Sequence, residues 1–427
     1  MTNNTLNVQS DWQVTPFQEL ATFETGRTPA RAIADFWAKE GTEGIPWSSI
    51  RDMRPYGVVR STAEKISPKA FQEVFRKRIS PKGTLLMSFK LTIGRVATLG
   101  LDACHNEAII SIFPNKRINQ KYLEYFLSQV DYAEYQDRAV KGNTLNQEKI
   151  NRIRVTEPSK PEQEKIAAVL WKIRHAIETE EKLIATVCEL KQSAMRQLFA
   201  NGLQREKQKE TDIGALPESW KVIPLGSLGR IGNGSTPLKR NMAYWTDGTI
   251  PWLTSAKVYD VTITKADQFI TPKAVQECHL PRVKPGSVLI AITGQGKTLG
   301  NAAVTAIETC VSQHIAYLQF NGEDANPHFI RLFIENRYRE LRAIGQGGGS
   351  TKGALTCSFM KNYLVPLPKR AEQDEMVFTL MSIEKNLTLH ECKLTTLQEL
   401  FKTLLNQLMT GEIRVADLDI DVTEIQT

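Results

Sequence analysis

Two stretches of the chain carry apolar side chains at intervals that alternate between four and three residues. In the first stretch these positions are Ile166, Leu170, Ile173, Ile177, Ile184, Val187 and Leu198. In the second they are Met376, Leu380, Ile383, Leu387, Leu394, Leu397, Phe401, Leu404 and Leu408. A period of 3.5 residues, held over about five heptads, is typical of coiled-coil helices. The pattern predicts long helices over residues 159–202 and 369–411.

The predicted length of these helices indicates how they pack. A helix of about forty residues spans ~60 Å, which is more than one small domain can cover. We therefore expect the two helices to pair with each other; the alternative is that each lies independently on its own domain. Glu180 and His390 interrupt the two apolar series at matched positions. In an antiparallel pair they could approach each other and fix the register, or both could reach water.

The remaining sequence has the pattern of mixed α+β domains. Short apolar runs predict strands over 84–89, 108–113, 288–292 and 315–320. Amphipathic segments predict helices over 121–130 and 326–336. Gly, Pro and Asn separate these segments.

The chain contains one unit of about 200 residues twice. Trp12 and Trp37 correspond to Trp220 and Trp245, and ISPKAFQE at 66–73 corresponds to ITPKAVQE at 270–277. PEQEKI at 161–166 corresponds to AEQDEM at 371–376. We predict domains over 1–158 and 217–368, a linker over 203–216 and a tail over 412–427. The predicted fold is two tandem α+β domains, each followed by a long helix, with the helices pairing as an antiparallel coiled coil with pseudo-two-fold symmetry.

The segment SVLIAITGQGKTLG at 287–300 raises the question of a nucleotide hydrolase. A phosphate-binding loop has the pattern GxxxxGK[ST], but Ala291 stands where the first glycine belongs. The matching stretch of the first unit, MSFKLTIGRVA, has no GK pair. We therefore interpret the segment as a turn between strands and keep the hydrolase as the alternative function.

Other searches for chemistry in the sequence exclude several classes of protein. The chain has no HExxH, GxSxG or adenine-methyltransferase tetrad, so we expect no catalysis of its own. None of the six cysteines forms a CxxC pair, and we expect no metal site. No run approaches the ~20 apolar residues of a membrane span, so we expect a cytoplasmic protein.

Charge and loop composition favour a polyanionic partner. The 54 basic and 47 acidic residues give a net charge of +7. Polar, glycine-containing loops carry Lys, Arg, Asn and Gln, whose side chains contact phosphates and base edges. Each could equally be a plain solvated turn. The candidate DNA-binding residues are Arg27, Arg31, Lys90, Arg95, Lys141, Asn143, Lys239, Arg240, Gln295, Lys297, Ser350 and Lys352.

From about Trp12 to Val415 the chain resembles the specificity subunits of type I restriction–modification enzymes. The resemblance rests on the two-unit layout, on TDIGALPESWKVIPLGSL and KPGSVLIAITGQGKTLGNAA, and on the closing LLNQLMTGEIRV. The first unit departs from it by lacking an IGALPESW-like entry.

The resemblance implies a function. Each α+β domain would be a target-recognition domain that reads one half of a bipartite, asymmetric site in double-stranded DNA. The helices would dock two methyltransferase subunits, and restriction subunits would join them. S-adenosylmethionine, ATP and Mg²⁺ are expected on those partners, with no cofactor bound directly by this chain.

Overall fold

The computed structural model describes residues 12–39, 41–135, 145–294, 297–347 and 354–423. It divides into two compact units, one formed by residues 1–181 and 392–427 and the other by residues 182–391. The predicted boundaries kept each long helix whole. The contacts instead divide each helix between the units, because each half packs against a different domain.

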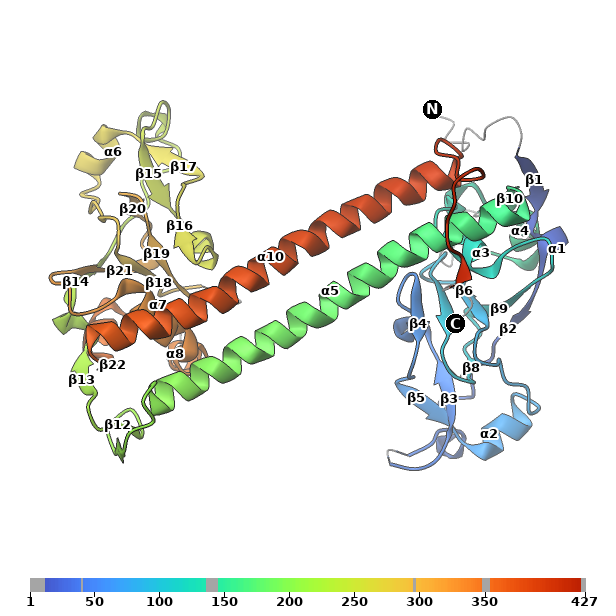
Figure 1. Ribbon diagram of the computed structural model, residues 1–427, viewed down its shortest axis with the longest axis horizontal. Coiled ribbons are helices and arrows are strands. Elements are labelled where there is room, and N and C mark those ends of the chain that lie inside the picture. Colours follow the sequence, from blue (N-terminus) through green and yellow to red (C-terminus); the bar gives the residue numbers. More distant parts are fainter. Residues whose placement is uncertain (1–11, 40, 136–144, 295–296, 348–353, 424–427) are drawn as a thin grey trace. The chain divides into compact units, whose positions relative to one another are not determined.

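Unit 1 contains a five-stranded sheet, a three-stranded sheet and a two-stranded ribbon (Figure 1). The five-stranded sheet has the order β2 (Ala21–Thr25), β9 (Ile109–Pro114), β6 (Leu85–Ser88), β7 (Val96–Leu99) and β4 (Gly57–Val59). The smaller sheet has the order β5 (Glu64–Ile66), β3 (Ile45–Ser48) and β8 (Cys104–His105), and the ribbon pairs β1 (Gln13–Pro16) with β10 (Arg154–Glu157). The unit's short helices are α1 (Phe17–Leu20), η1 (Ala34–Phe36), η2 (Ile50–Asp52), α2 (Pro68–Glu73), α3 (Gln120–Leu127), η3 (Tyr132–Tyr135) and α4 (Gln147–Asn151).

Unit 2 repeats this topology strand for strand. Its five-stranded sheet has the order β14 (Gly229–Asn233), β21 (Ile315–Phe320), β18 (Val288–Ala291), β19 (Ala302–Thr305) and β16 (Thr262–Ile263). The smaller sheet has the order β17 (Gln268–Ile270), β15 (Ile250–Leu253) and β20 (Cys310–Val311), and the ribbon pairs β13 (Lys221–Pro224) with β22 (Leu364–Leu367). The short helices are η4 (Leu225–Ser227), η5 (Met242–Tyr244), η6 (Ser255–Tyr259), α6 (Pro272–Glu277), α7 (Pro327–Asn336), α8 (Tyr338–Gln346) and α9 (Cys357–Asn362). The predicted tandem α+β architecture is confirmed.

The long helices are α5 (Lys160–Asn201) and α10 (Arg370–Met409), and they pack antiparallel within each unit. In unit 1, Glu180 is buried and forms an ion pair with Lys393, one turn from His390. In unit 2, Lys191 forms an ion pair with Glu384 at 2.7 Å. All the predicted apolar positions of both helices are buried or half-buried, as a coiled-coil interface requires.

The segment predicted as a linker, 203–216, is partly structured. Gln208–Lys209 (β11) pairs with Leu216–Pro217 (β12), and Leu216 is buried in the core of unit 2. The polar run before it is solvent-exposed, as expected, but the end of the segment belongs to the domain.

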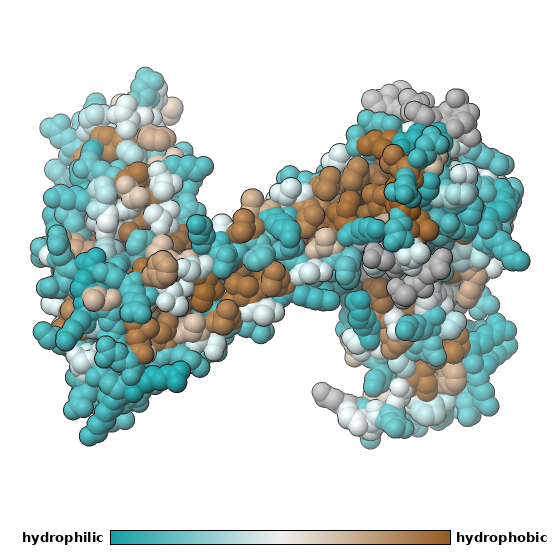
Figure 2. Space-filling model, viewed as in Figure 1, coloured by the Kyte–Doolittle hydropathy of each residue, from teal (hydrophilic) through white to brown (hydrophobic). Residues whose placement is uncertain are grey.

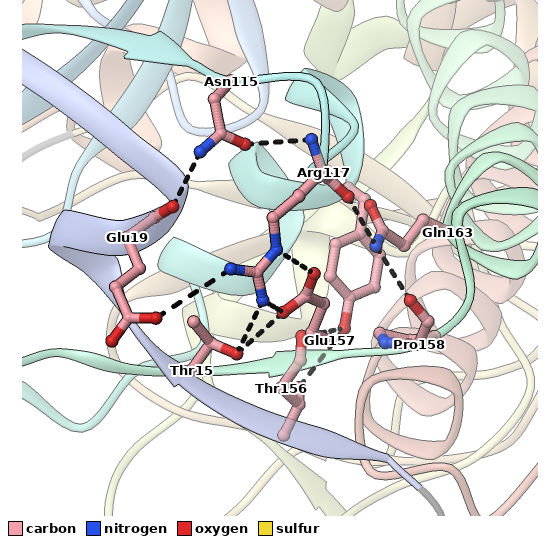
Figure 3. Close-up of polar contacts among 9 residues, drawn as sticks. Thr15, Glu19, Asn115, Arg117, Thr156, Glu157, Pro158 and Gln163 are labelled. Carbon is pink, nitrogen blue, oxygen red and sulfur yellow. Dashed lines mark hydrogen bonds and ion pairs between the residues drawn. The ribbon is translucent and has the colours of Figure 1, made fainter.

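A buried glutamine joins each domain to its long helix, and Figure 3 shows the one in unit 1, Gln163. In unit 1, the Asn119 N–H donates to Gln163 Oε1 at 2.7 Å, and Gln163 Nε2 donates to the carbonyl oxygens of Pro158 and Arg117 at 2.9 and 3.2 Å. Gln373 makes the same three bonds in unit 2, accepting from the Asn326 N–H and donating to two carbonyls. One side chain thus fixes the start of the long helix to the start of α3 or α7.

The polar interior of unit 1 differs from that of unit 2 at three equivalent positions. His105 is buried, and its Nε2 lies 2.5 Å from Ser111 Oγ, which lies 2.8 Å from Ser80 Oγ. The strand and bridge registers place Val283, Val311 and Tyr317 where Ser80, His105 and Ser111 stand. Burial lowers the pKa of His105 to about 4, because the charged imidazolium is poorly solvated there.

We predict that Gln163→Ala lowers the free energy of unfolding of unit 1 by roughly 2–4 kcal/mol, because it leaves buried backbone groups without partners. Gln373→Ala should do the same to unit 2. Urea unfolding of the full chain measures both. Gln192→Ala, at an exposed position of α5, is the control, with an expected change within about 0.5 kcal/mol. Equal effects of all three substitutions on the free energy of unfolding would contradict the structural role of the two glutamines.

We also predict that unit 1 loses stability as the pH falls from about 6.5 to about 4. In this window the unfolded chain binds a proton at His105 that the folded chain excludes, which costs the folded state about 3 kcal/mol at the lower limit. His105→Val, which copies Val311, should flatten this dependence and leave Ser111 bonded to Ser80. Hydrogen exchange of peptides from β6 and β9 at pH 7.5 and 5 measures this stability. The same loss of stability in the wild type and in His105→Val would refute the prediction.

Candidate nucleic-acid interface

The predicted loops of unit 1 lie together at one edge of its five-stranded sheet. β2 and β6 end at this edge, and β7 and β9 begin there. The Gly26 N–H donates to Ile109 O at 3.1 Å, and the Phe89 N–H donates to Ala108 O at 2.9 Å. A third predicted segment ends at the same place, because the Leu145 N–H donates to Phe89 O at 3.0 Å. Segments far apart in sequence therefore form one surface.

Unit 2 gathers its equivalent loops in the same way. β14 and β18 end where β19 and β21 begin. The Leu355 N–H donates to Ile292 O at 2.7 Å, which joins the segment after the glycine-rich run to the loop at 292–301. Two equivalent loop clusters, one per unit, are thus present.

The first loop of each cluster is held rigidly by a glycine. A Cβ on Gly26 would lie 2.2 Å from His105 O, and one on Gly234 would lie 1.6 Å from Val311 O, so neither position accepts a side chain. A tryptophan then fixes the next residue in each unit: Trp47 Nε1 donates to Arg27 O at 3.0 Å, and Trp252 Nε1 donates to Ser235 O at 3.2 Å.

The Arg31 side chain in the first cluster contacts both an aromatic ring and a carboxylate. Its guanidinium lies 3.8 Å from the centre of the Trp37 ring and pairs through both terminal nitrogens with Glu64. The same carboxylate accepts from Arg51 at 2.9 Å. The hydrogen bonds from Arg31 lower the pKa of Glu64, so the carboxylate stays charged and holds Arg31 in one orientation. The Arg31 side chain remains 56% exposed.

The other described candidates of unit 1 are partly used within the fold. Arg27 donates to Val74 O at 2.7 Å, and Arg95 donates to Ile50 O and Met53 O at 3.1 and 3.4 Å. Arg95 thereby ties its loop to the loop around η2. Lys90 Nζ lies 5.2 Å from the centre of the Phe89 ring. Arg27 and Lys90 are exposed and half-exposed, respectively, and they stay predictions.

In unit 2, Lys239, Arg240 and Lys297 are exposed at the equivalent cluster. Gln268 replaces Glu64 in the strand register, so no carboxylate stands there to fix a cation. Lys141, Asn143, Gln295, Ser350 and Lys352 lie outside the described residues.

Sequence reasoning missed a basic segment beside the first cluster. Arg76, Lys77 and Arg78 are all exposed, and the first two have φ values of 52° and 62°. The bond from Arg27 to Val74 O places this segment next to the loop at 24–31. Three consecutive basic residues were the signal in the sequence, which the search for polar glycine-containing loops did not include.

The GKT segment does not form a phosphate-binding loop. β18 and β19 are antiparallel neighbours, with Val288 opposite Val304, so the segment at 292–301 joins two strands. A phosphate-binding loop leads from a strand into a helix whose N-terminus receives the anion. Here Tyr338 Oη donates to Lys297 O at 2.8 Å and Asn301 Nδ2 donates to it at 2.7 Å, which fixes the loop through its backbone. The interpretation as a turn is confirmed, and the hydrolase alternative has no support.

No helix among the described residues carries an apolar stretch long enough to cross a lipid bilayer.

Comparison with known proteins gives concordant results. The specificity subunit of the type I restriction enzyme MjaIX from Methanocaldococcus jannaschii is 22% identical over 96% of this chain and 95% of its own length. The crystal structure of a type I restriction–modification S subunit from M. genitalium superposes with a TM-score of 0.62 at 14% identity, covering 96% of this chain and 98% of that one. A chain from a structure on complex assembly and conformational transition of the type I R-M system gives a TM-score of 0.53 at 16% identity, covering 95% and 99%.

The family model described as the type I restriction modification DNA specificity domain matches residues 9–189 and again residues 217–399. The two matches coincide with the two repeats of the sequence, and together they cover most of the chain. This chain belongs to the family of type I restriction–modification DNA specificity domains, of which it carries two copies.

Proposed function

We propose that this chain is the DNA sequence-specificity subunit of a type I restriction–modification complex. The observation that carries the proposal is the pair of equivalent loop clusters, each at the same sheet edge of a specificity domain. Each cluster reads one half of a bipartite site in double-stranded DNA. The chain supplies recognition, and the chemistry on DNA belongs to partner subunits.

The two half-sites differ in sequence because the two clusters differ in chemistry. Cluster 1, the loop cluster of unit 1, presents Arg31 over Trp37, where Glu64 holds it. Cluster 2, the loop cluster of unit 2, has no carboxylate at the position of Glu64. The loop at 292–301 is also longer than its counterpart at 89–95. Direct readout depends on where donors and acceptors stand in the groove, so unlike clusters select unlike bases.

The long helices provide the docking surface for the partners. Apolar side chains remain exposed on them, and Figure 2 shows apolar surface along both helices. The exposed side chains are Leu183, Leu190, Phe378, Leu389 and Leu400. Two methyltransferase subunits, which bring S-adenosylmethionine, dock here, and restriction subunits, which use ATP and Mg²⁺, join the complex. Exposed apolar groups of this kind are stabilised by burial against another protein.

The length of the paired helices sets the spacer between the half-sites. We predict that inserting one heptad into each helix, between residues 181 and 182 and between 391 and 392, keeps the apolar pattern in phase. The insertion adds about 10 Å, or about three base pairs at 3.4 Å each. Sequencing methylated DNA from cells that express the variant with its methyltransferase partner should show both half-sites unchanged and a spacer longer by about three base pairs.

The matched control is a seven-residue insertion after Gly322, in an exposed loop between β21 and α7. It should leave the methylated sequence and the spacer unchanged. An unchanged spacer in the helix variant would show that the helices do not set the distance. Changed half-sites would show that the loop clusters do not act alone.

Lys297 tests the contribution of cluster 2. We predict that Lys297→Ala weakens DNA binding by the complex and lowers the slope of log K against log salt by about 1, as loss of one phosphate contact does. Lys284→Ala is the control, because Lys284 is exposed at the turn before β18, at the opposite edge of the same sheet. Binding titrations over a range of salt concentrations measure the slope for both variants and the wild type. Equal slopes for Lys297→Ala and the wild type would show that Lys297 does not contact phosphate.

A further inference from the structure

Leu91 lies at the tip of the loop between β6 and β7, within cluster 1. Its side chain is 83% exposed, more than any other large apolar side chain among the described residues. Its backbone has φ of 65°, in the left-handed region that favours glycine or asparagine. Two unfavourable features, an exposed apolar side chain and a left-handed backbone, therefore coincide at one residue.

Hydrogen bonds and packing hold both sides of the loop that carries Leu91. Ser88 Oγ donates to Thr92 O, and the Gly94 N–H donates to Ser88 O at 2.9 Å. A Cβ on Gly94 would lie 2.3 Å from the Tyr132 ring, so the loop packs tightly on the domain. Arg95 ties the far side of the loop to Ile50 O and Met53 O. The scaffold is rigid, and only the tip extends from it.

We propose that Leu91 is an apolar wedge that enters the base stack of the half-site read by unit 1. The proposal rests on the function proposed above. Proteins that kink DNA insert apolar side chains of this kind between base steps, which partly unstacks them. The interior of the stack is an apolar environment, and it would remove Leu91 from water.

The surroundings of Leu91 favour DNA over a protein partner. Lys90 directly precedes it and is half-exposed, and the loop with the exposed Arg27 and Arg31 leaves the same sheet edge. Cations around an apolar tip can neutralise phosphates on both sides of a base step. The apolar side chains expected to bind protein partners lie instead on the long helices.

The wedge belongs to unit 1 alone. The corresponding tip of unit 2 consists of Thr293, Gly294, Gln295, Gly296, Lys297 and Thr298, with no apolar residue. The apolar residue of that loop, Leu299, is buried. The loop between β18 and β19 therefore has no counterpart of Leu91, and we expect the unstacking at the half-site read by unit 1.

The test uses the complete complex with its methyltransferase subunits and DNA that contains the methylated site. 2-Aminopurine, which fluoresces more strongly when unstacked, replaces one base at a time in both half-sites. The wild-type complex should raise the fluorescence at one step of the first half-site, besides the methylated adenine. Leu91→Ala should abolish this increase and weaken binding by about ten-fold, since a buried leucine side chain contributes about that factor.

Leu91→Gly separates the wedge from folding. Glycine relieves the left-handed backbone, so this variant should unfold at the same temperature as the wild type or higher, yet lose the fluorescence increase. Leu418→Ala, which truncates a 52% exposed leucine in the C-terminal tail, is the control. It should change neither the fluorescence increase nor the unfolding temperature. Signals from the second half-site should be unaffected by all three substitutions.

The outcomes separate this inference from the proposed function. A wild-type complex that binds no DNA sequence selectively would refute both. Selective binding with a fluorescence pattern that Leu91→Ala leaves unchanged would refute the wedge alone. Loss of methyltransferase subunits from Leu91→Ala in the absence of DNA would assign Leu91 to a protein contact and also overturn the wedge.

Discussion

The rest of the structure depends on the buried glutamine at the start of each long helix. Gln163 and Gln373 each accept one backbone N–H and donate to two backbone carbonyls. Because the three partners belong to the domain and to the entry of the helix, the glutamine fixes the direction in which the helix leaves. The loop clusters and the helices can act together only if that direction is constant. A buried amide with every group bonded is well suited to this, because any other orientation leaves polar groups unpaired.

One pair of equivalent positions on the short and long helices carries opposite charges in the two units. In unit 2, Arg331 of α7 pairs with Glu384 of α10 through both carboxylate oxygens at 2.7 and 2.8 Å. Burial raises the pKa of Glu384, but the charges of Arg331 and Lys191 outweigh it and hold the pKa below its ordinary value. In unit 1 the equivalent positions carry Glu124 of α3 and Arg174 of α5, five and eleven residues after the matched Asn119 and Gln163. There Glu124 accepts from Thr98 and Lys121, and Arg174 pairs with Glu178, so the same positions make different contacts in the two units.

Much of the architecture followed from periodicity, since the apolar seam and the matched motifs PEQEKI and AEQDEM mark both helices and their entries. The turn at 292–301 also followed, because its partner in the first repeat lacks GK. The partners of individual side chains could not be predicted from the sequence. Glu180 pairs with Lys393, and Glu64 holds Arg31 across 33 residues. Such contacts depend on strand and helix register and on side-chain rotamers, which the local sequence pattern does not give. The exposure and left-handed backbone of Leu91 could not be predicted either, because its sequence context is an ordinary polar loop.

The ends of the helices show why each unit requires both of them. After α5, a Cβ on Gly202 would lie 3.2 Å from the Trp220 ring, and Glu372 accepts from the Leu203 N–H and from Trp220 Nε1. After α10, a Cβ on Gly411 would lie 3.4 Å from the Trp12 ring, and Arg414 bonds to the buried Glu162. The opening tryptophan of each domain is thus covered by the segment that follows the helix of the other repeat. Each domain therefore completes its core with residues from the other repeat, and neither repeat supplies all of these contacts from its own sequence.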